Sequence, residues 1–359
     1  MKPFEPIDPI EAGFAADALA EAVAHAEANE TSWPRDVGQH LENGRFLDRE
    51  HGAIIGPTRP RGGPAGLIVR DGRLVTTWGD VGRADMTFSV TKSVMSALAG
   101  IAYDRGLLPD LDAPVAELVD DGGFDSPQNA SITWRHLLQQ TSEWEGTLWD
   151  KPDLVDRNRD VSGGDNSRKG EHRDLQAPGT YWEYNDVRVN RLSLALMRLF
   201  NQPLPVVLKE AIMEPVGASD GWEWHGYENS WIELDGERHQ SVSGGGHWGG
   251  GMFVSASDLA RLGLLYLNDG RWGERQILTK AWIDLTRTPC DIYAPYGFLW
   301  WLNTGRAMFP AAPESSYFAL GSGGHVIWVD PDRDMVAVMR WLDDEAQDGF
   351  IERTLAAAR

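Results

Sequence analysis

The chain has 359 residues and a formal net charge of −21 at pH 7, which repels polyphosphate and argues against nucleic-acid binding. Hydrophobic residues make up 42% of it and charged residues 24%, the balance of a soluble protein with one large or two medium domains. No apolar run approaches the ~18 residues of a membrane span, and residues 1–23 do not resemble a signal peptide. We therefore expect a cytoplasmic protein that contacts no membrane.

The cysteine and histidine content argues against a metal site. One cysteine, Cys290, permits neither an intramolecular disulfide nor a multi-cysteine metal site. The nine histidines form no H-E-x-x-H or H-x-H pattern. We expect no metal and no cofactor, and the composition leaves a homo-oligomer open.

The first part of the chain predicts a helix, a hairpin and a second helix. Helical spacing of apolar residues predicts a helix over about 11–29. Two strand-like runs then flank Asp71-Gly72, a dipeptide favoured in tight hairpins. The pattern becomes helical again over about 88–105, and Gly106 is a plausible end of that helix.

The remainder of the chain changes from helical to strand-like patterns. Residues 107–245 indicate mostly helix and loop, with no evident strand pair. Later segments predict helices at 257–267, 280–288 and 350–358, and strands at 296–303, 315–321, 325–331 and 334–341. This order predicts an α+β fold, an antiparallel sheet flanked by helices with an inserted, mostly helical domain. The expected boundaries are 1–106 with 246–359 for the sheet domain and 107–245 for the helical domain.

The stretch "MTFSVTKSVMSALAG", residues 86–100, places Ser89 and Lys92 three residues apart at the start of a helix. That spacing puts both side chains on one helix face, so the lysine amine can contact the serine hydroxyl. A serine becomes a nucleophile when a neighbour takes its proton, and free N–H groups at a helix start stabilise an oxyanion. The alternative is that Ser89 is an ordinary helix cap, because the four-residue pattern alone is weak.

Further motifs carry a resemblance to a known family. They are "PGTYWEYNDVRVN" at 178–190, "GGGMFVSASDLARLGLLYLNDG" at 249–270 and "SSYFALGSGGHVIWVDP" at 315–331. With the leading S-x-x-K, the chain resembles the serine-reactive β-lactamase and penicillin-binding-protein superfamily. The likeness is greatest to the class C branch, which includes family VIII carboxylesterases and 6-aminohexanoate-dimer hydrolases. It covers about residues 65–342.

The resemblance implies roles for three side chains and two backbone groups. Ser89 would be the acylated nucleophile, with Lys92 as its general base or the partner that tunes it. Tyr184, in the Tyr-x-Asn position, would be the second proton-transfer group. The backbone N–H groups of Ser89 and Ser322 would be the oxyanion donors.

Two positions depart from the family pattern. The strand end that normally carries Lys-Thr-Gly or a His-x-Gly variant reads Ala319-Leu320-Gly321, so the cation that binds the carboxylate of penicillin-like substrates is absent. Asp186 replaces the expected asparagine, and a carboxylate near Lys92 would favour its ammonium form. Three alternatives follow. Tyr184 becomes the working base, or Asp186 faces outward toward a cationic substrate, or the register slips and Asn185 enters the pocket.

Several further residues are candidates for substrate contact beside Asp186. They are Gly321 and His325 at the glycine-rich turn, Trp144, Glu145 and Trp149 in the polar segment 142–179, and Trp248 in "GGHWGGGM". A competing G-x-S-x-G match at 217–221 follows a helical pattern rather than the buried strand that an α/β-hydrolase elbow needs.

These observations predict a serine hydrolase. It would cleave a small ester or amide, with a linear oligoamide or a carbamate as variants, through an acyl-enzyme on Ser89. The alternatives are a β-lactamase or D-amino-acid peptidase of the same superfamily, and a penicillin-binding-like sensor module that does not turn over.

Overall fold

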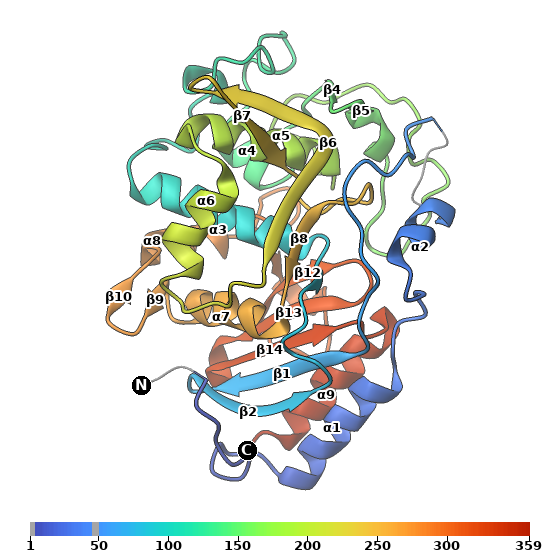
Figure 1. The fold of residues 1–359 in the computed structure, drawn as a ribbon, viewed down its shortest axis with the longest axis vertical. Coiled ribbons are helices and arrows are strands. Elements are labelled where there is room, and N and C mark those ends of the chain that lie inside the picture. Colours follow the sequence, from blue (N-terminus) through green and yellow to red (C-terminus); the bar gives the residue numbers. More distant parts are fainter. Residues whose placement is uncertain (1–3, 45–49) are drawn as a thin grey trace.

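The computed structural model describes residues 4–44 and 50–359. Its centre is a six-stranded antiparallel sheet in the order β11-β12-β13-β14-β1-β2 (Figure 1). The strands are β1 (Ala65–Arg70), β2 (Arg73–Trp78), β3 (Asp85–Met86), β4 (Thr147–Leu148), β5 (Lys151–Pro152), β6 (Glu223–Leu234), β7 (Glu237–Val242), β8 (Gly251–Val254), β9 (Arg271–Trp272), β10 (Arg275–Gln276), β11 (Trp301–Leu302), β12 (Tyr317–Gly321), β13 (His325–Asp330) and β14 (Met335–Arg340).

Helices lie on both faces of this sheet. The α-helices are α1 (Ala16–Ala28), α2 (Val37–Asn43), α3 (Val90–Asp104), α4 (Trp134–Leu138), α5 (Asp186–Phe200), α6 (Leu204–Leu208), α7 (Ala256–Leu267), α8 (Lys280–Thr286) and α9 (Gln347–Ala357). Short helical turns are η1 (Val115–Glu117), η2 (Asp153–Asp156), η3 (Lys209–Met213), η4 (Thr304–Arg306), η5 (Pro331–Arg333) and η6 (Asp344–Ala346). Helices α1 and α9 pack together beside β1 and β2, and α7 packs against β13 and β14 (Figure 1).

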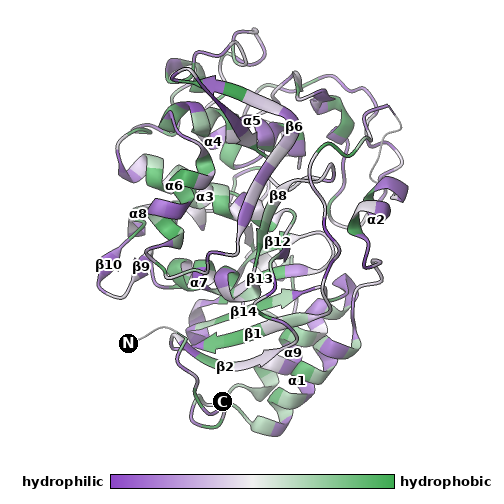
Figure 2. Cartoon of the chain, viewed as in Figure 1, coloured by the Kyte–Doolittle hydropathy of each residue, from purple (hydrophilic) through white to green (hydrophobic). Residues whose placement is uncertain are grey.

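The predicted α+β class is confirmed, and the hydrophobic pattern explains the layers. Every residue of β13 and β14 is buried, because helices cover the sheet on both faces. Figure 2 shows the corresponding hydrophobic colouring along β1. The predicted hairpin joins β1 to β2, with Asp71 and Gly72 at φ of 50° and 70°, as a tight two-residue turn requires.

The expectation that residues 107–245 contain no strand pair is wrong. β6 and β7 form a long hairpin that joins β8 and β3 in a four-stranded sheet of order β3-β8-β6-β7. The hairpin was missed because β6 is half polar and lacks clean alternation. Its turn is Asp235-Gly236, the same dipeptide type that predicted the first hairpin, with both φ values positive. The domain division itself stays a prediction.

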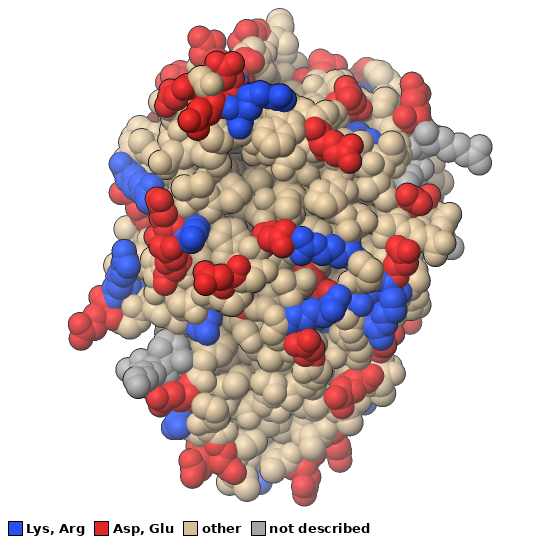
Figure 3. Space-filling view, viewed as in Figure 1, with Lys and Arg blue, Asp and Glu red and all other residues tan. Residues whose placement is uncertain are grey.

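Within the described residues, no helix has the length and apolar character that crossing a bilayer requires. Figure 3 shows acidic side chains scattered over one face of the molecule, with basic ones interspersed among them and several basic side chains grouped right of its centre.

Candidate active site

Ser89 lies immediately before α3 in the first turn of the helix, but its hydroxyl does not cap the helix. Instead, Lys92 Nζ donates a hydrogen bond of 2.7 Å to Ser89 Oγ. The preceding residue, Phe88, has a φ of +46°, a sparsely populated conformation for a bulky side chain. The chain therefore turns sharply at the serine, and the helix-cap alternative does not describe this hydroxyl.

The turn before α3 is closed by the end of β12. A Cβ atom at Gly321 would lie 2.3 Å from the carbonyl oxygen of Thr87 and 3.3 Å from the backbone nitrogen of Ser89, so only glycine permits this approach. Ser322 follows directly and lines the same cavity as Ser89. Among the described residues, neither the Ser89 nor the Ser322 backbone N–H donates to a protein acceptor.

Lys92 is fully buried, and its ammonium faces three oxygens. They are Ser89 Oγ at 2.7 Å, Asp186 Oδ1 at 2.8 Å and the Gly244 carbonyl at 3.2 Å. Burial alone would lower the pKa of Lys92, but the Asp186 carboxylate outweighs it and the pKa is raised. Lys92 is therefore held as an ammonium ion.

Tyr184 also lies close to Lys92. The Lys92 ammonium is 5.1 Å from the centre of the tyrosine ring, and the Arg159 guanidinium is 5.2 Å from it. The ring is buried and stacks on Trp301 at a centroid distance of 5.6 Å. The structure thus brings both Ser89 and Tyr184 next to Lys92.

Asp186 and Asn185 take different roles at the start of α5. Asn185 is the N-cap of the helix: its side chain accepts hydrogen bonds from the backbone N–H groups of Val187 and Arg188. Asp186 is 2% exposed and faces Lys92 rather than solvent. The outward-facing and slipped-register alternatives are therefore both wrong.

A family model described as Beta-lactamase matches residues 58–358. The chain belongs to the beta-lactamase family. It is accordingly a serine hydrolase of the β-lactamase and penicillin-binding-protein superfamily.

Individual relatives are distant. A curated protein of Escherichia coli O157:H7 with the provisional name D-alanyl-D-alanine carboxypeptidase is 23% identical, over 86% of this chain and 84% of its own length. A penicillin-binding protein homologue from Caulobacter crescentus has a TM-score of 0.61 at 16% identity, covering 96% of this chain and 99% of its own. EstCE1, described as a hydrolase with promiscuous acyltransferase activity, has a TM-score of 0.59 at 17% identity, covering 95% and 98%. At these identities the structures show the shared fold.

Four residues that the sequence suggested for substrate contact lie away from the cavity of this beta-lactamase-family protein. His325 is 1% exposed, and its Nδ1 accepts a hydrogen bond of 2.8 Å from Arg340. Burial and that guanidinium hold the pKa of His325 well below its usual value, so the ring is neutral. Trp144 donates from its indole nitrogen to the Gly123 carbonyl at 2.7 Å, and Trp248 donates to the His51 carbonyl at 3.0 Å. Trp149 packs against the main core.

Glu145 is also placed differently from the expectation. Its side chain is exposed, and its nearest cation, Arg157, is 3.9 Å away. The neighbouring Glu143 is fully buried instead and binds Arg173 and Arg188. The polar segment 142–179 is thus held by internal ion pairs, and Glu143 was missed because buried and exposed carboxylates look alike in sequence.

Several residues that line the cavity around Ser89 were not predicted from the sequence. Its lining consists of Trp33, Leu41, Phe88, Ser89, Arg159, Asp186, Gly245, Gly246, His247 and Ser322. Trp33 and Leu41 come from the segment that contains α2, which no periodicity signal predicted. Arg159 comes from the polar segment 142–179. Nothing in the sequence distinguishes it from other arginines of that loop.

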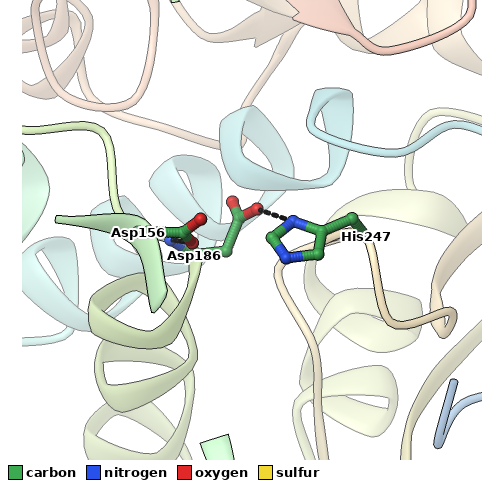
Figure 4. Close-up of side chains that lie close together, drawn as sticks. All are labelled: Asp156, Asp186 and His247. Carbon is green, nitrogen blue, oxygen red and sulfur yellow. Dashed lines mark hydrogen bonds and ion pairs between the residues drawn. The ribbon is translucent and has the colours of Figure 1, made fainter. Parts of the chain in front are cut away.

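Asp156, Asp186 and His247 form a buried cluster with the composition of a metal site (Figure 4). Their ligand atoms lie within 4.8 Å of one another, and His247 Nδ1 is 3.3 Å from Asp186 Oδ2. Protein cations already face the carboxylates: Arg159 Nη1 is 2.9 Å from Asp186 Oδ2, and Lys169 Nζ is 3.1 Å from Asp156 Oδ1. A divalent cation would meet these positive charges, so the cluster fits an ion-pair network better than a metal.

The competing G-x-S-x-G match has a structural role. Ser219 donates from its hydroxyl to Asp258 Oδ2 at 2.6 Å and lies in a turn after η3. That hydrogen bond joins the turn to α7. The residues around Ser219 follow a helical segment, as the sequence indicated.

Proposed function

We propose that this protein cleaves a small ester or amide through an acyl-enzyme intermediate on Ser89. The observation that carries the proposal is the hydrogen bond from Lys92 to Ser89 Oγ, in a cavity that two unused backbone N–H groups also line. A carbonyl whose oxygen lies between those two N–H groups presents its carbon to Ser89 Oγ. The tetrahedral intermediate then gains two hydrogen bonds, the largest single contribution in many acyl-transfer enzymes.

The proton of Ser89 goes to the Lys92–Tyr184 pair. Lys92 already uses its three N–H directions on Ser89, Asp186 and Gly244, so the ammonium form cannot itself accept the proton. Tyr184 is the remaining acceptor: it takes the proton as a phenolate and becomes a neutral phenol, and the positive charges of Lys92 and Arg159 beside its ring stabilise the phenolate before that transfer. The same phenol returns the proton to the leaving group and later activates water.

The substrate class follows from the absent cation at the end of β12. Ala319 occupies the position where the family pattern has a lysine or histidine, so a penicillin-like carboxylate has no cationic partner there. This favours a neutral ester or amide over a lactam. Similarity to EstCE1 and to a provisionally named 6-aminohexanoate-dimer hydrolase from Bacillus anthracis supports hydrolysis of linear esters or amides.

Labelling and turnover separate this proposal from its alternatives. An active-site phosphonate should label Ser89, and p-nitrophenyl acetate should be turned over by the wild type and not by Ser89→Ala. Ser93→Ala is the matched control, because Ser93 lies one turn further along α3 and donates only to the Leu299 carbonyl. Linear amides and a chromogenic cephalosporin complete the panel.

The possible results point to different functions. Labelling without turnover of any ester or amide would support the sensor module. Turnover of the cephalosporin in preference to the esters would support a β-lactamase, and preference for a D-alanyl-D-alanine peptide would support a peptidase. If Ser89→Ala retained esterase activity, the acyl-enzyme proposal would be wrong.

A further inference from the structure

Two buried carboxylates beside the active site share two cations of the loop 157–170. The side chain of Asp156 is fully buried, and that of Asp186 is almost so. Arg159 Nη1 lies 2.9 Å from Asp186 Oδ2 and 3.6 Å from Asp156 Oδ1. Lys169 Nζ lies 3.1 Å from that same Asp156 oxygen. Arg159 is therefore within ion-pair distance of both carboxylates, and Lys169 faces one oxygen of Asp156.

A backbone hydrogen bond brings the two ends of this loop together. The N–H of Gly170 donates to the carbonyl of Arg157 at 2.9 Å. Arg159 lies just after the first end of the loop, and Lys169 lies just before the second. Both side chains are mostly buried, although residues 162–168 between them are exposed. The closure of the loop thus delivers both cations to the same buried carboxylate.

Asp156 is ionised, and Lys169 is the cation that favours this charge most. Burial would raise the pKa of Asp156, but Lys169, and after it Arg159, outweigh burial and lower this pKa. The other carboxylate oxygen, Oδ2, accepts a hydrogen bond of 2.9 Å from the backbone N–H of Asp186. His247 lies beside both carboxylates, and burial lowers the pKa of its imidazole. The neutral ring adds no positive charge that could replace that of Lys169.

The other titratable groups around the carboxylates and Arg159 come from separate elements. They are Lys92, Tyr184, Tyr227 and Tyr296. Burial raises the pKa of Tyr227 and of Tyr296, so these two phenols stay neutral. Among the described residues, the positive charge of this network is therefore that of Lys92, Arg159 and Lys169.

Arg159 serves two partners, so the charge on Asp156 affects its position. The guanidinium faces Asp186 and also lies 5.2 Å from the ring centre of Tyr184. An ionised carboxylate that is buried without a partner is strongly unfavourable. Without Lys169, Asp156 would attract this guanidinium away from Asp186. The ring of Tyr184 would then lose the same positive charge.

We propose that Lys169 is a positioning residue: by pairing with Asp156 it keeps Arg159 in the active site. There the guanidinium stabilises the phenolate of Tyr184 that accepts the serine proton. This role rests on the proposed function and assigns a part in it to a residue that does not line the Ser89 cavity.

The test measures the pH dependence of kcat/KM for p-nitrophenyl acetate. Lys169→Met should move the acidic limb up by about one pH unit, since a positive charge is lost and Arg159 moves away from the proton acceptor. Lys169→Arg keeps the cation and should restore the wild-type limb. Arg168→Met is the matched control: it removes a positive charge from the same loop, but Arg168 is 68% exposed and pairs with Glu171. Its limb should lie within about 0.3 pH units of wild type, because solvent screens exposed charges.

A double variant separates positioning from a simple effect of charge through space. Asp156→Asn removes the competing carboxylate, so the further change Lys169→Met cannot displace Arg159. The limb of the double variant should therefore lie close to that of wild type. The sum of the two single shifts should exceed the shift of the double variant by at least about half a pH unit. If the single shifts instead add up to that of the double variant, Lys169 acts only as a charge, and the positioning role is wrong.

The remaining outcomes distinguish this role from the proposed function. An unchanged acidic limb in Lys169→Met, with Ser89-dependent turnover present, would overturn the role of Lys169 and leave the proposed function intact. If Lys169→Met fails to fold, Lys169→Gln is measured in its place. If no ester is turned over, the pH dependence of Ser89 labelling by a phosphonate probe gives the same comparison. Absence of both turnover and labelling would overturn this role together with the proposed function.

Discussion

Replacing Asp186 with asparagine tests the electrostatics of the site most directly. The carboxylate lies 2.8 Å from Lys92 Nζ and raises the pKa of that lysine against the effect of burial. Asparagine keeps the shape and can still accept a hydrogen bond, but it removes the charge. Without the carboxylate, burial favours loss of a proton from the Lys92–Tyr184 pair.

The size of the expected pH shift follows from the short distance between the Asp186 carboxylate and Lys92 Nζ. An opposite charge this close moves a pKa by about one to three units, so the acidic limb of the kcat/KM profile should move down by about one to three pH units. The active form of the site has one proton less than the fully protonated form, and removal of a nearby negative charge favours that form whichever residue has lost the proton. The direction of the shift is therefore the same whether Lys92 or Tyr184 is the working base.

Stability should change in a defined pH window. The raised pKa of Lys92 stabilises the fold below the ordinary lysine value, and this contribution is lost as the pH rises through the folded-state pKa. Burial opposes the charge on Asp186, but Lys92 and Arg159 outweigh it and hold its pKa well below the usual value. Its contribution is therefore present above about pH 4 and lost as the pH falls further. Between about pH 4 and pH 10, Asp186→Asn should lower the free energy of unfolding by about 3–5 kcal/mol.

The assay is a pH–rate profile for an ester substrate, with thermal unfolding measured in the same buffers. Asp156→Asn is the matched control, since Asp156 is buried and pairs with Arg159 and Lys169 but does not contact Lys92. Asp156→Asn should lower the free energy of unfolding, but the acidic limb of its rate profile should move less than that of Asp186→Asn. An acidic limb in Asp186→Asn at the wild-type pH would refute the claim that this carboxylate sets the protonation of the catalytic pair.

Three further predictions concern residues that support the site. Asn185→Ala removes the cap of α5 and should lower the free energy of unfolding by about 1–2 kcal/mol, measured by denaturant titration; no loss would mean that the cap bonds are not made in solution. Trp144→Phe removes the hydrogen bond to Gly123 and should cost about 1 kcal/mol with KM unchanged, whereas a raised KM would place Trp144 at the substrate. His325→Leu leaves Arg340 Nε unpaired and should cost about 1–3 kcal/mol, again without a change in KM for the ester. A changed KM at full stability would contradict its structural role.

Local sequence signals predicted most of the fold. The turn dipeptide Asp71-Gly72, the helix after Phe88 and the late strands were readable because each follows from neighbouring residues. The β6–β7 hairpin was not predicted, since strand β6 mixes polar and apolar residues without regular alternation. Helix α2 has only seven residues and depends on packing against Phe88 and Trp341, which are distant in sequence.

In the candidate site, too, only the features that depend on neighbouring residues were predictable from the sequence. The pairing of Ser89 with Lys92 was predictable because both lie on one helical turn. Arg159 and Leu41 line the cavity because tertiary contacts place their loop and helix beside it. The spacing of hydrophobic residues in the sequence does not indicate such contacts. Trp248 and His325 were candidates because they lie near glycine-rich turns. Proximity in sequence does not fix which face of a strand or loop a side chain occupies.

The central sheet has a consequence for how the protein is made. β1 lies between β2, which follows it at once, and β14, which is synthesised some 270 residues later. The turn that holds Ser322 also belongs to these late strands. A nascent chain lacking its final segment therefore has the serine but neither Ser322, whose backbone N–H is proposed as the second oxyanion donor, nor the sheet that supports α3. Such long-range pairing is slow to form, so hydrolytic competence should arise only as translation ends.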